Sequence, residues 1–164
     1  MATTAQRQHV KHLCDIFKAH AGELLYPPGD VRTGIEWHDW HLSETQLELI
    51  LARGGQVMLD CSDTASWWFK CAGLWPFSQP GFTGTWFDWL GRHAYTDAKL
   101  ALLAAPVIFG PRPGHHMGVV YKTDPVHGNP LIAGHGRPGF DIAPLSTVAA
   151  SQPRGITFLS IAGL

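Results

Sequence analysis

Charge is scarce in this sequence: Asp, Glu, Lys and Arg make up 15% of the 164 residues, and the formal net charge is −1 with histidine neutral. A chain without a strong basic or acidic excess has no long-range attraction to nucleic acid or to an anionic membrane surface. Long apolar runs are missing too, since no stretch reaches the roughly 18 residues of a membrane-spanning helix. We therefore expect a partner that is neither nucleic acid nor a membrane.

Signals for secretion and for disulfide bonding are also missing. The N-terminal segment MATTAQRQHVKHLCDIFKAH lacks the uninterrupted apolar core of a signal peptide. Cys14, Cys61 and Cys71 are an odd set, too sparse for a disulfide scaffold. We expect a chain that is made in the cytoplasm without a signal peptide and carries at least one free thiol.

Three segments carry helical patterns. Apolar residues recur at helical spacing over residues 5–25, and a second helix is predicted over residues 44–53. Ser43 is a suitable N-cap for that second helix, and Gln46 would complete a capping box. A third helix is predicted over residues 62–72, because its apolar residues lie at i, i+3, i+4 and i+7.

The pattern changes to strands in the second half of the chain. Short β-rich runs bounded by Gly or Pro occur at residues 106–109, 116–121, 130–134 and 156–161. The loop 122–130 would join two neighbouring antiparallel strands. Helices followed by strands predict one α+β domain over residues 1–164.

The segment 74–93 is rich in glycine, proline and aromatic residues. We interpret it as a structured loop that forms one wall of a substrate groove, because linkers are not this aromatic. Residues 31–42 carry no pattern that assigns them to a helix or a strand.

Cys61 is the candidate nucleophile among the three cysteines. Cys14 and Cys71 lie within predicted helices and are typical of small buried apolar residues. Cys61 instead stands where the apolar stretch Val57-Met58-Leu59 turns into a helix. A thiol at a helix N-terminus has a lowered pKa, and the thiolate is the nucleophilic form.

The adjacent histidines His115 and His116 are candidates for the base that a reactive cysteine needs. Successive strand side chains point to opposite faces of the sheet, so at most one of the two can face the thiol. His116 shares a face with Gly118, where a glycine leaves room for close approach. His115 follows a Pro-Gly turn and is expected to be exposed. We therefore predict His116 as the base.

A third residue should orient the base. The length of the loop after the His116 strand places the cross-strand neighbours of His116 near positions 135–137. His135 is a polar residue there, and Asp141 would reach His116 only if the chain curls back. We favour His135 over Asp141.

The order of these motifs resembles the NlpC-type cell-wall cysteine peptidases. Asp60-Cys61-Ser62 is similar to the motif that opens the catalytic helix of that family. His116-Met117-Gly118-Val119 resembles the family's His-x-Gly-[Ile/Val] strand, and His135 stands where the third polar residue follows. The resemblance covers about residues 57–162, with residues 1–56 as an N-terminal helical part. It implies a papain-like fold, in which a catalytic helix packs on an antiparallel sheet.

Three features depart from the family. Asp63 replaces the usual glycine after Cys-Ser, and the segment 74–104 is long and rich in tryptophan. Tyr26 is only a loose match for the family's upstream tyrosine, which helps to form the oxyanion site, because its spacing to Cys61 is wider.

The resemblance implies a peptidoglycan hydrolase, similar to a phage endolysin, that cleaves an amide bond of the peptide stem or cross-link. We expect no cofactor and no metal, and a monomer that is either a protein by itself or a domain linked to a wall-binding module in a longer parent. An injected antibacterial amidase or a papain-like acyltransferase would use the same residues.

Two other classes compete with this interpretation. His38-x-x-His41 has the spacing of zinc ligands, and Cys61 with His115 or His116 would complete a set. The chain has no Cys-x-x-Cys pair and no His-Glu-x-x-His motif, which argues against zinc. A non-catalytic glycan-binding module would use the aromatic segment, although buried aromatic residues more often fill a core.

Overall fold

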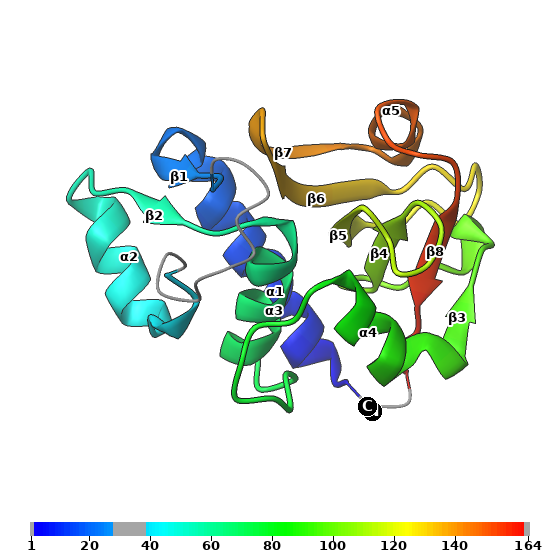
Figure 1. The fold of residues 1–164 in the computed structure, drawn as a ribbon, viewed down its shortest axis with the longest axis horizontal. Coiled ribbons are helices and arrows are strands. Elements are labelled where there is room, and N and C mark those ends of the chain that lie inside the picture. Colours follow the sequence, from blue (N-terminus) through cyan, green and yellow to red (C-terminus); the bar gives the residue numbers. More distant parts are fainter. Residues whose placement is uncertain (1, 28–38, 163–164) are drawn as a thin grey trace.

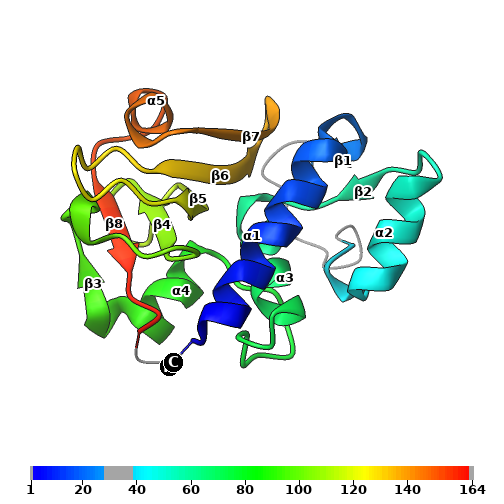
Figure 2. The ribbon, with the colours of Figure 1, turned by 180° about the vertical axis from the view of Figure 1, so that it is seen from behind.

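The computed structural model describes residues 2–27 and 39–162 and has an α+β fold (Figures 1 and 2). Helices α1 (Thr4–Ala19), α2 (Glu44–Ala52) and α3 (Cys61–Cys71) form one half of the molecule. A six-stranded antiparallel sheet forms the other half, and α3 packs on it. Within the described residues, no helix is both long and apolar enough to cross a bilayer.

The sheet has the strand order β3-β8-β4-β5-β6-β7. Its strands are β3 (Ala94–Tyr95), β4 (Pro106–Phe109), β5 (His116–Lys122), β6 (Leu131–Gly136), β7 (Gly139–Pro144) and β8 (Ile156–Leu159). A separate parallel pair joins β1 (Leu24–Leu25) to β2 (Val57–Met58). The remaining elements are α4 (Thr83–Leu90), α5 (Leu145–Ala150) and the 3-10 helices η1 (Ala21–Glu23), η3 (Asp39–His41), η4 (Gly91–His93) and η5 (Ala98–Leu100).

Side chains cap the three N-terminal helices. Ser43 and Gln46 form the predicted capping box of α2, and Asp60 and Asp63 form an equivalent box at the start of α3. Each box satisfies backbone N–H groups that have no partner inside the helix. In the box of α3 the Asp63 carboxylate accepts a hydrogen bond from the Asp60 amide at 3.4 Å.

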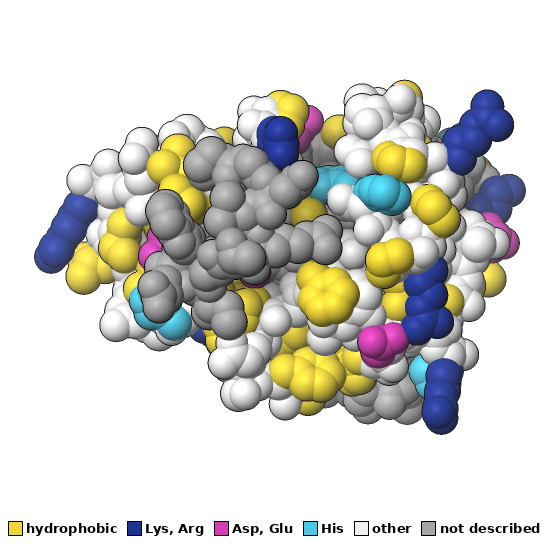
Figure 3. Space-filling view, in the orientation of Figure 1, with side chains coloured by type: hydrophobic (Ala, Val, Ile, Leu, Met, Phe, Trp, Pro, Cys, Tyr) yellow, Lys and Arg dark blue, Asp and Glu magenta, His cyan; other side chains and the backbone are white. Residues whose placement is uncertain are grey.

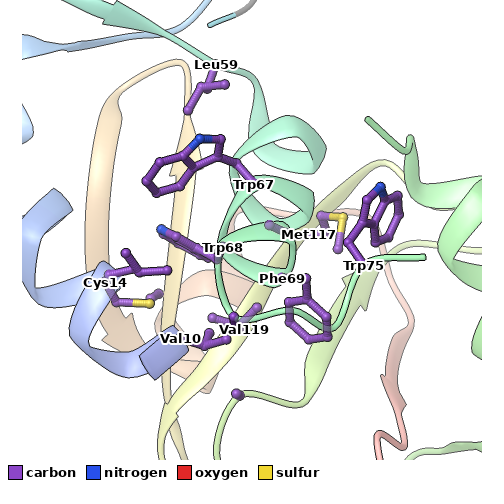
Figure 4. Close-up of a cluster of buried hydrophobic side chains, with 14 of the residues drawn as sticks. Val10, Cys14, Leu59, Trp67, Trp68, Phe69, Trp75, Met117 and Val119 are labelled. Carbon is purple, nitrogen blue, oxygen red and sulfur yellow. The ribbon is translucent and has the colours of Figure 1, made fainter. Parts of the chain in front are cut away.

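Helix α3 is the central helix of the fold. Its residues from Cys61 to Phe69 are all buried, because α1 covers one side and strands β5 and β6 cover the other. Figure 4 shows Trp67, Trp68 and Phe69 of α3 pointing in different directions into this core. A helix enclosed on several sides provides a rigid support for the residue at its N-terminus.

Strands β5 and β6 separate at one end. They pair as far as Gly118 and Gly134, whereas β5 continues to pair with β4 as far as His116. Strand β6 likewise continues to pair with β7 as far as Gly136. The sheet is therefore split between β5 and β6 at the end where His116 lies.

Several predicted elements differ from the structure. The first helix ends at Ala19, because the residues that follow form η1 and then pair as β1 with β2. The segment 74–93 is only partly a loop, since Thr83–Leu90 forms α4. Strand β7 and helix α5 were not predicted. All four predicted strands are present, as β4, β5, β6 and β8, and the antiparallel connection of β5 to β6 is confirmed.

Candidate active site

Cys61 is the first residue of α3 and directly follows its N-cap, Asp60. The Asp60 Oδ1 atom accepts hydrogen bonds from the backbone amides of Ser62 and Asp63, both at 2.7 Å. Strand β2 ends at Met58, so the thiol lies at a strand–helix junction, as the sequence predicts. The Cys61 side chain is 8% exposed.

Tyr26 contacts this thiol. Its hydroxyl donates a hydrogen bond to the Cys61 sulfur over 3.8 Å. The contact depends on the short β1–β2 pairing, because Leu25 pairs with Met58 and the Leu59 amide bonds to the Leu25 carbonyl at 3.1 Å. Tyr26 directly follows β1, and Cys61 lies shortly after β2. The pairing of these strands therefore brings the two residues together despite their wide spacing in the sequence.

The split in the sheet also reaches the thiol. The backbone amide of Met117 lies beside the Cys61 sulfur, at the end of β5 that has separated from β6. The amide of Ser62 and the Tyr26 hydroxyl also face the sulfur. Three hydrogen-bond donors therefore surround the atom that would carry negative charge in a thiolate.

The environment nevertheless raises the pKa of Cys61 to about 11. Burial is the main cause, and the adjacent Asp60 carboxylate adds to it, whereas the amides of Met117 and Ser62 and the Tyr26 hydroxyl act in the opposite direction. The prediction of a lowered pKa for Cys61 is wrong, because burial outweighs the amides at the helix N-terminus. The thiol is protonated at neutral pH, so a thiolate would form there only if a base removed the proton.

His116 lies at the start of β5, next to the Met117 amide that contacts the sulfur. Its half-buried ring stacks on Phe109, with ring centroids 5.9 Å apart. Burial lowers the pKa of His116, and the Asp60 carboxylate opposes this change. The imidazole is therefore neutral at pH 7 and able to accept a proton. Within the described residues, no hydrogen bond joins the ring to Cys61 or to His135.

The two other candidate histidines differ in burial. His115 is exposed, as predicted. His135 is fully buried on the α3 face of the sheet, where its Nδ1 atom lies 3.4 Å from the Thr64 hydroxyl. Its ring also contacts the edge of the Tyr26 ring, with a centroid distance of 5.5 Å. His135 therefore contacts both α3 and the Tyr26 ring.

A cleft of about 520 Å³ lies beside the site, on the α5 side of the sheet. Tyr26 and His116 line it at one end, Asp141 of β7 lines its wall, and residues of α5 close the far side. Figure 3 shows histidine side chains gathered on the surface near β5 and β6. Cys61 is not among the described residues that line the cleft; Tyr26 stands between the cleft and the sulfur.

The aromatic segment after α3 packs mainly on itself. Trp86 is fully buried and contacts Phe69 of α3, and the rings of Trp75 and Trp89 lie against it. Among the described residues these tryptophans do not line the cleft described above, and Trp75 and Trp86 belong to the core. That the segment forms a groove wall stays a prediction. Phe77 and Phe82 remain exposed.

The two other cysteines differ in burial. Cys14 is fully buried in α1, as predicted, and burial raises its pKa well above the usual range. Cys71 is only half-buried, and burial raises its pKa to about 12.

The metal-site hypothesis involves His38, which lies outside the described residues. Within residues 2–27 and 39–162, the structure contains no group of three or more His, Cys, Asp or Glu side chains arranged to hold a metal ion. The protein-family models and the curated proteins with which the chain was compared gave no match.

Proposed function

We propose that this protein is a papain-like cysteine hydrolase in which Cys61 is the nucleophile and His116 is the base. The observation that carries the proposal is the placement of the Cys61 sulfur among the donors Met117 N–H, Ser62 N–H and Tyr26 O–H, beside the strand that begins with His116. A nucleophile, an adjacent base and preorganised donors are the parts that acyl transfer requires.

In the reaction, His116 removes the proton of the Cys61 thiol as the sulfur attacks an amide carbonyl carbon. The resulting oxyanion accepts hydrogen bonds from the Cys61 backbone N–H and from the Tyr26 hydroxyl. The protonated His116 then donates its proton to the leaving amine, which leaves a thioester on Cys61. His116 removes a proton from water, the hydroxide attacks the thioester, and the thiol is released.

The raised pKa of Cys61 is compatible with this mechanism. A thiol that is protonated at rest transfers its proton only when the substrate carbonyl receives the new bond, so neutral His116 must be present as acceptor. The thiolate then forms next to three donors, and these lower its free energy relative to an exposed thiolate.

We propose peptidoglycan peptides as substrates. The support is the order of three motifs, Asp60-Cys61-Ser62, His116-Met117-Gly118-Val119 and the His135 strand, which resembles the NlpC-type cell-wall peptidases. A cleft of about 520 Å³, whose lining includes Tyr26 and His116, is the proposed binding site for the peptide.

The test is digestion of purified muropeptides, with mass spectrometry of the products. We expect one peptide or amide bond to be cut, with a new amine and a new carboxylate, both with and without EDTA. Cys61→Ala is the matched control and should give no products. Products from the Cys61→Ala protein would refute the proposed mechanism.

A further inference from the structure

Asp141 and the His116 ring lie on the same face of the sheet. A Cβ atom at Gly134 would lie 3.5 Å from His116 Nε2, and one at Gly136 would lie 3.6 Å from Cε1. The ring therefore extends across the outer face of β6. Gly134 pairs directly with Asp141 of β7, and Asp141 lines the same cleft as His116.

His135 lies on the opposite face. Side chains alternate along a strand, so the residue between Gly134 and Gly136 must point to the other side of β6. The contact between His135 Nδ1 and Thr64 of α3 agrees with this direction. The β6 backbone thus separates the His135 ring from the His116 ring.

The Asp141 side chain starts from the strand next to the one that His116 Nε2 overlies. Directly paired residues of antiparallel strands have Cβ atoms about 5 Å apart, which places Asp141 one strand spacing from the position below Nε2. Asp141 Oδ1 accepts a hydrogen bond from the Ile142 amide at 2.7 Å. In the described part of the chain, Oδ2 has no hydrogen-bond partner.

We propose that Asp141, and not His135, is the positioning residue of His116. Its carboxylate accepts the Nε2–H of the His116 ring, which fixes the tautomer whose Nδ1 is free to accept a proton. The inference rests on the proposed function, in which His116 is the base. The contact between Asp141 and His116 can nevertheless be measured without any substrate.

Charged and titratable groups face His116 from several elements. Asp60 belongs to the start of α3, His115 precedes it on the chain, and Arg137 and Asp141 line the cleft from the β6–β7 side. His135 lies behind β6. Only the variants at Asp141 remove the proposed partner while Asp60 remains in place.

The test is the nitrogen NMR spectrum of the His116 ring, assigned by comparison with His116→Ala. In the wild-type protein we expect the Nε2–H tautomer. In Asp141→Ala the His116 ring should lose this preference and titrate at lower pH. In Asp141→Asn the ring should retain the tautomer but still titrate at lower pH. Asp88→Asn removes an exposed carboxylate paired with Arg112 and is the matched control that should change neither property.

Kinetics on muropeptides add a second measurement. Asp141→Ala should lower kcat by about tenfold or more and leave KM nearly unchanged, and Asp141→Glu should restore part of the loss. If wild-type protein cuts no muropeptide while the ring responds as expected, the proposed function fails and the positioning contact stands. The inference is overturned if Asp141→Ala leaves the tautomer unchanged, or if His135→Gln is the variant that alters it.

Discussion

The Tyr26 hydroxyl donates a hydrogen bond to the Cys61 sulfur over 3.8 Å, although 35 residues separate the two in the sequence. This contact lowers the pKa of Cys61 against the larger effect of burial. In the proposed mechanism the same hydroxyl also donates to the oxyanion that forms after attack by the sulfur. Tyr26 therefore contacts the thiol with its hydroxyl and also lines the cleft.

Tyr26→Phe should lower kcat on muropeptides by roughly a hundredfold, because it removes one preorganised donor from the developing oxyanion. The ring remains, so its edge contact with His135 and the stability of the protein should be retained. Steady-state kinetics and urea unfolding measure the two effects separately. A Tyr26→Phe protein with wild-type turnover would exclude Tyr26 from the oxyanion site.

Cys61→Ala should abolish cleavage, since no other group supplies the sulfur nucleophile. Cys14→Ser and Cys71→Ser should retain most of the turnover of the properly folded protein. Because Cys14 is fully buried, Cys14→Ser should have a lower free energy of unfolding than wild type. Circular dichroism before each assay distinguishes an unfolded variant from an inactive one.

Alkylation of Cys61 by iodoacetamide should accelerate steadily as the pH rises from 7 to 10. With the Cys61 pKa at about 11, the thiolate fraction grows about tenfold for each pH unit in this range. Mass spectrometry of the Cys71→Ser protein measures this rate without labelling at the half-buried Cys71. A rate that levels off near pH 7 would mean that His116 already holds the thiol proton in the free protein.

The two adjacent histidines should differ strongly. His116→Ala should reduce kcat by about a hundredfold to ten-thousandfold, as loss of a general base does. His115→Ala removes an exposed side chain from the same strand end and is the matched control with nearly normal turnover. The reverse result would make His115 the base and would require a different register at the start of β5.

The placements of Cys61 and His116 could be predicted because each depends on a local pattern. Asp60-Cys61-Ser62 contains its own N-cap, and His116 begins a β-rich run. The capping box of α2 was predicted for the same reason. Such features are encoded within about four residues of sequence and need no knowledge of the rest of the fold. The face that His116 shares with Gly118 lies opposite the α3 face to which His135 points, and the contact of His116 with the thiol stays a prediction.

The remaining parts of the site depend on non-local pairing. Tyr26 reaches Cys61 only through two-residue strands, β1 and β2, which no periodicity reveals. The position of His135 depends on the parity of the β5–β6 register, and a difference of one residue moves a side chain to the other face. Strand β7 was missed because Asp141 and Pro144 interrupt an already short apolar pattern, so its pairing with Gly134 could not be anticipated.

The buried His135 should make the protein sensitive to acid. Burial lowers the pKa of His135 from 6.5 to about 4, with partial opposition from Asp60 and from the Leu24 carbonyl. The folded protein therefore binds the His135 proton less tightly than the unfolded chain does. By linkage, the stabilisation is complete above pH 6.5 and is lost progressively as the pH falls towards 4.

The expected loss between pH 6.5 and 4 is on the order of 3 kcal/mol, from the difference between the two pKa values of His135. His135→Gln cannot take up this proton, so its free energy of unfolding should fall less than that of wild type over the same range. The variant should be less stable than wild type at pH 7, because it loses the packing of the ring against Tyr26, and the gap should narrow at pH 4.5. Urea unfolding of both proteins at the two pH values measures this. An equal loss in both would show that other groups cause the acid sensitivity and that the His135 ring is not held neutral by its burial.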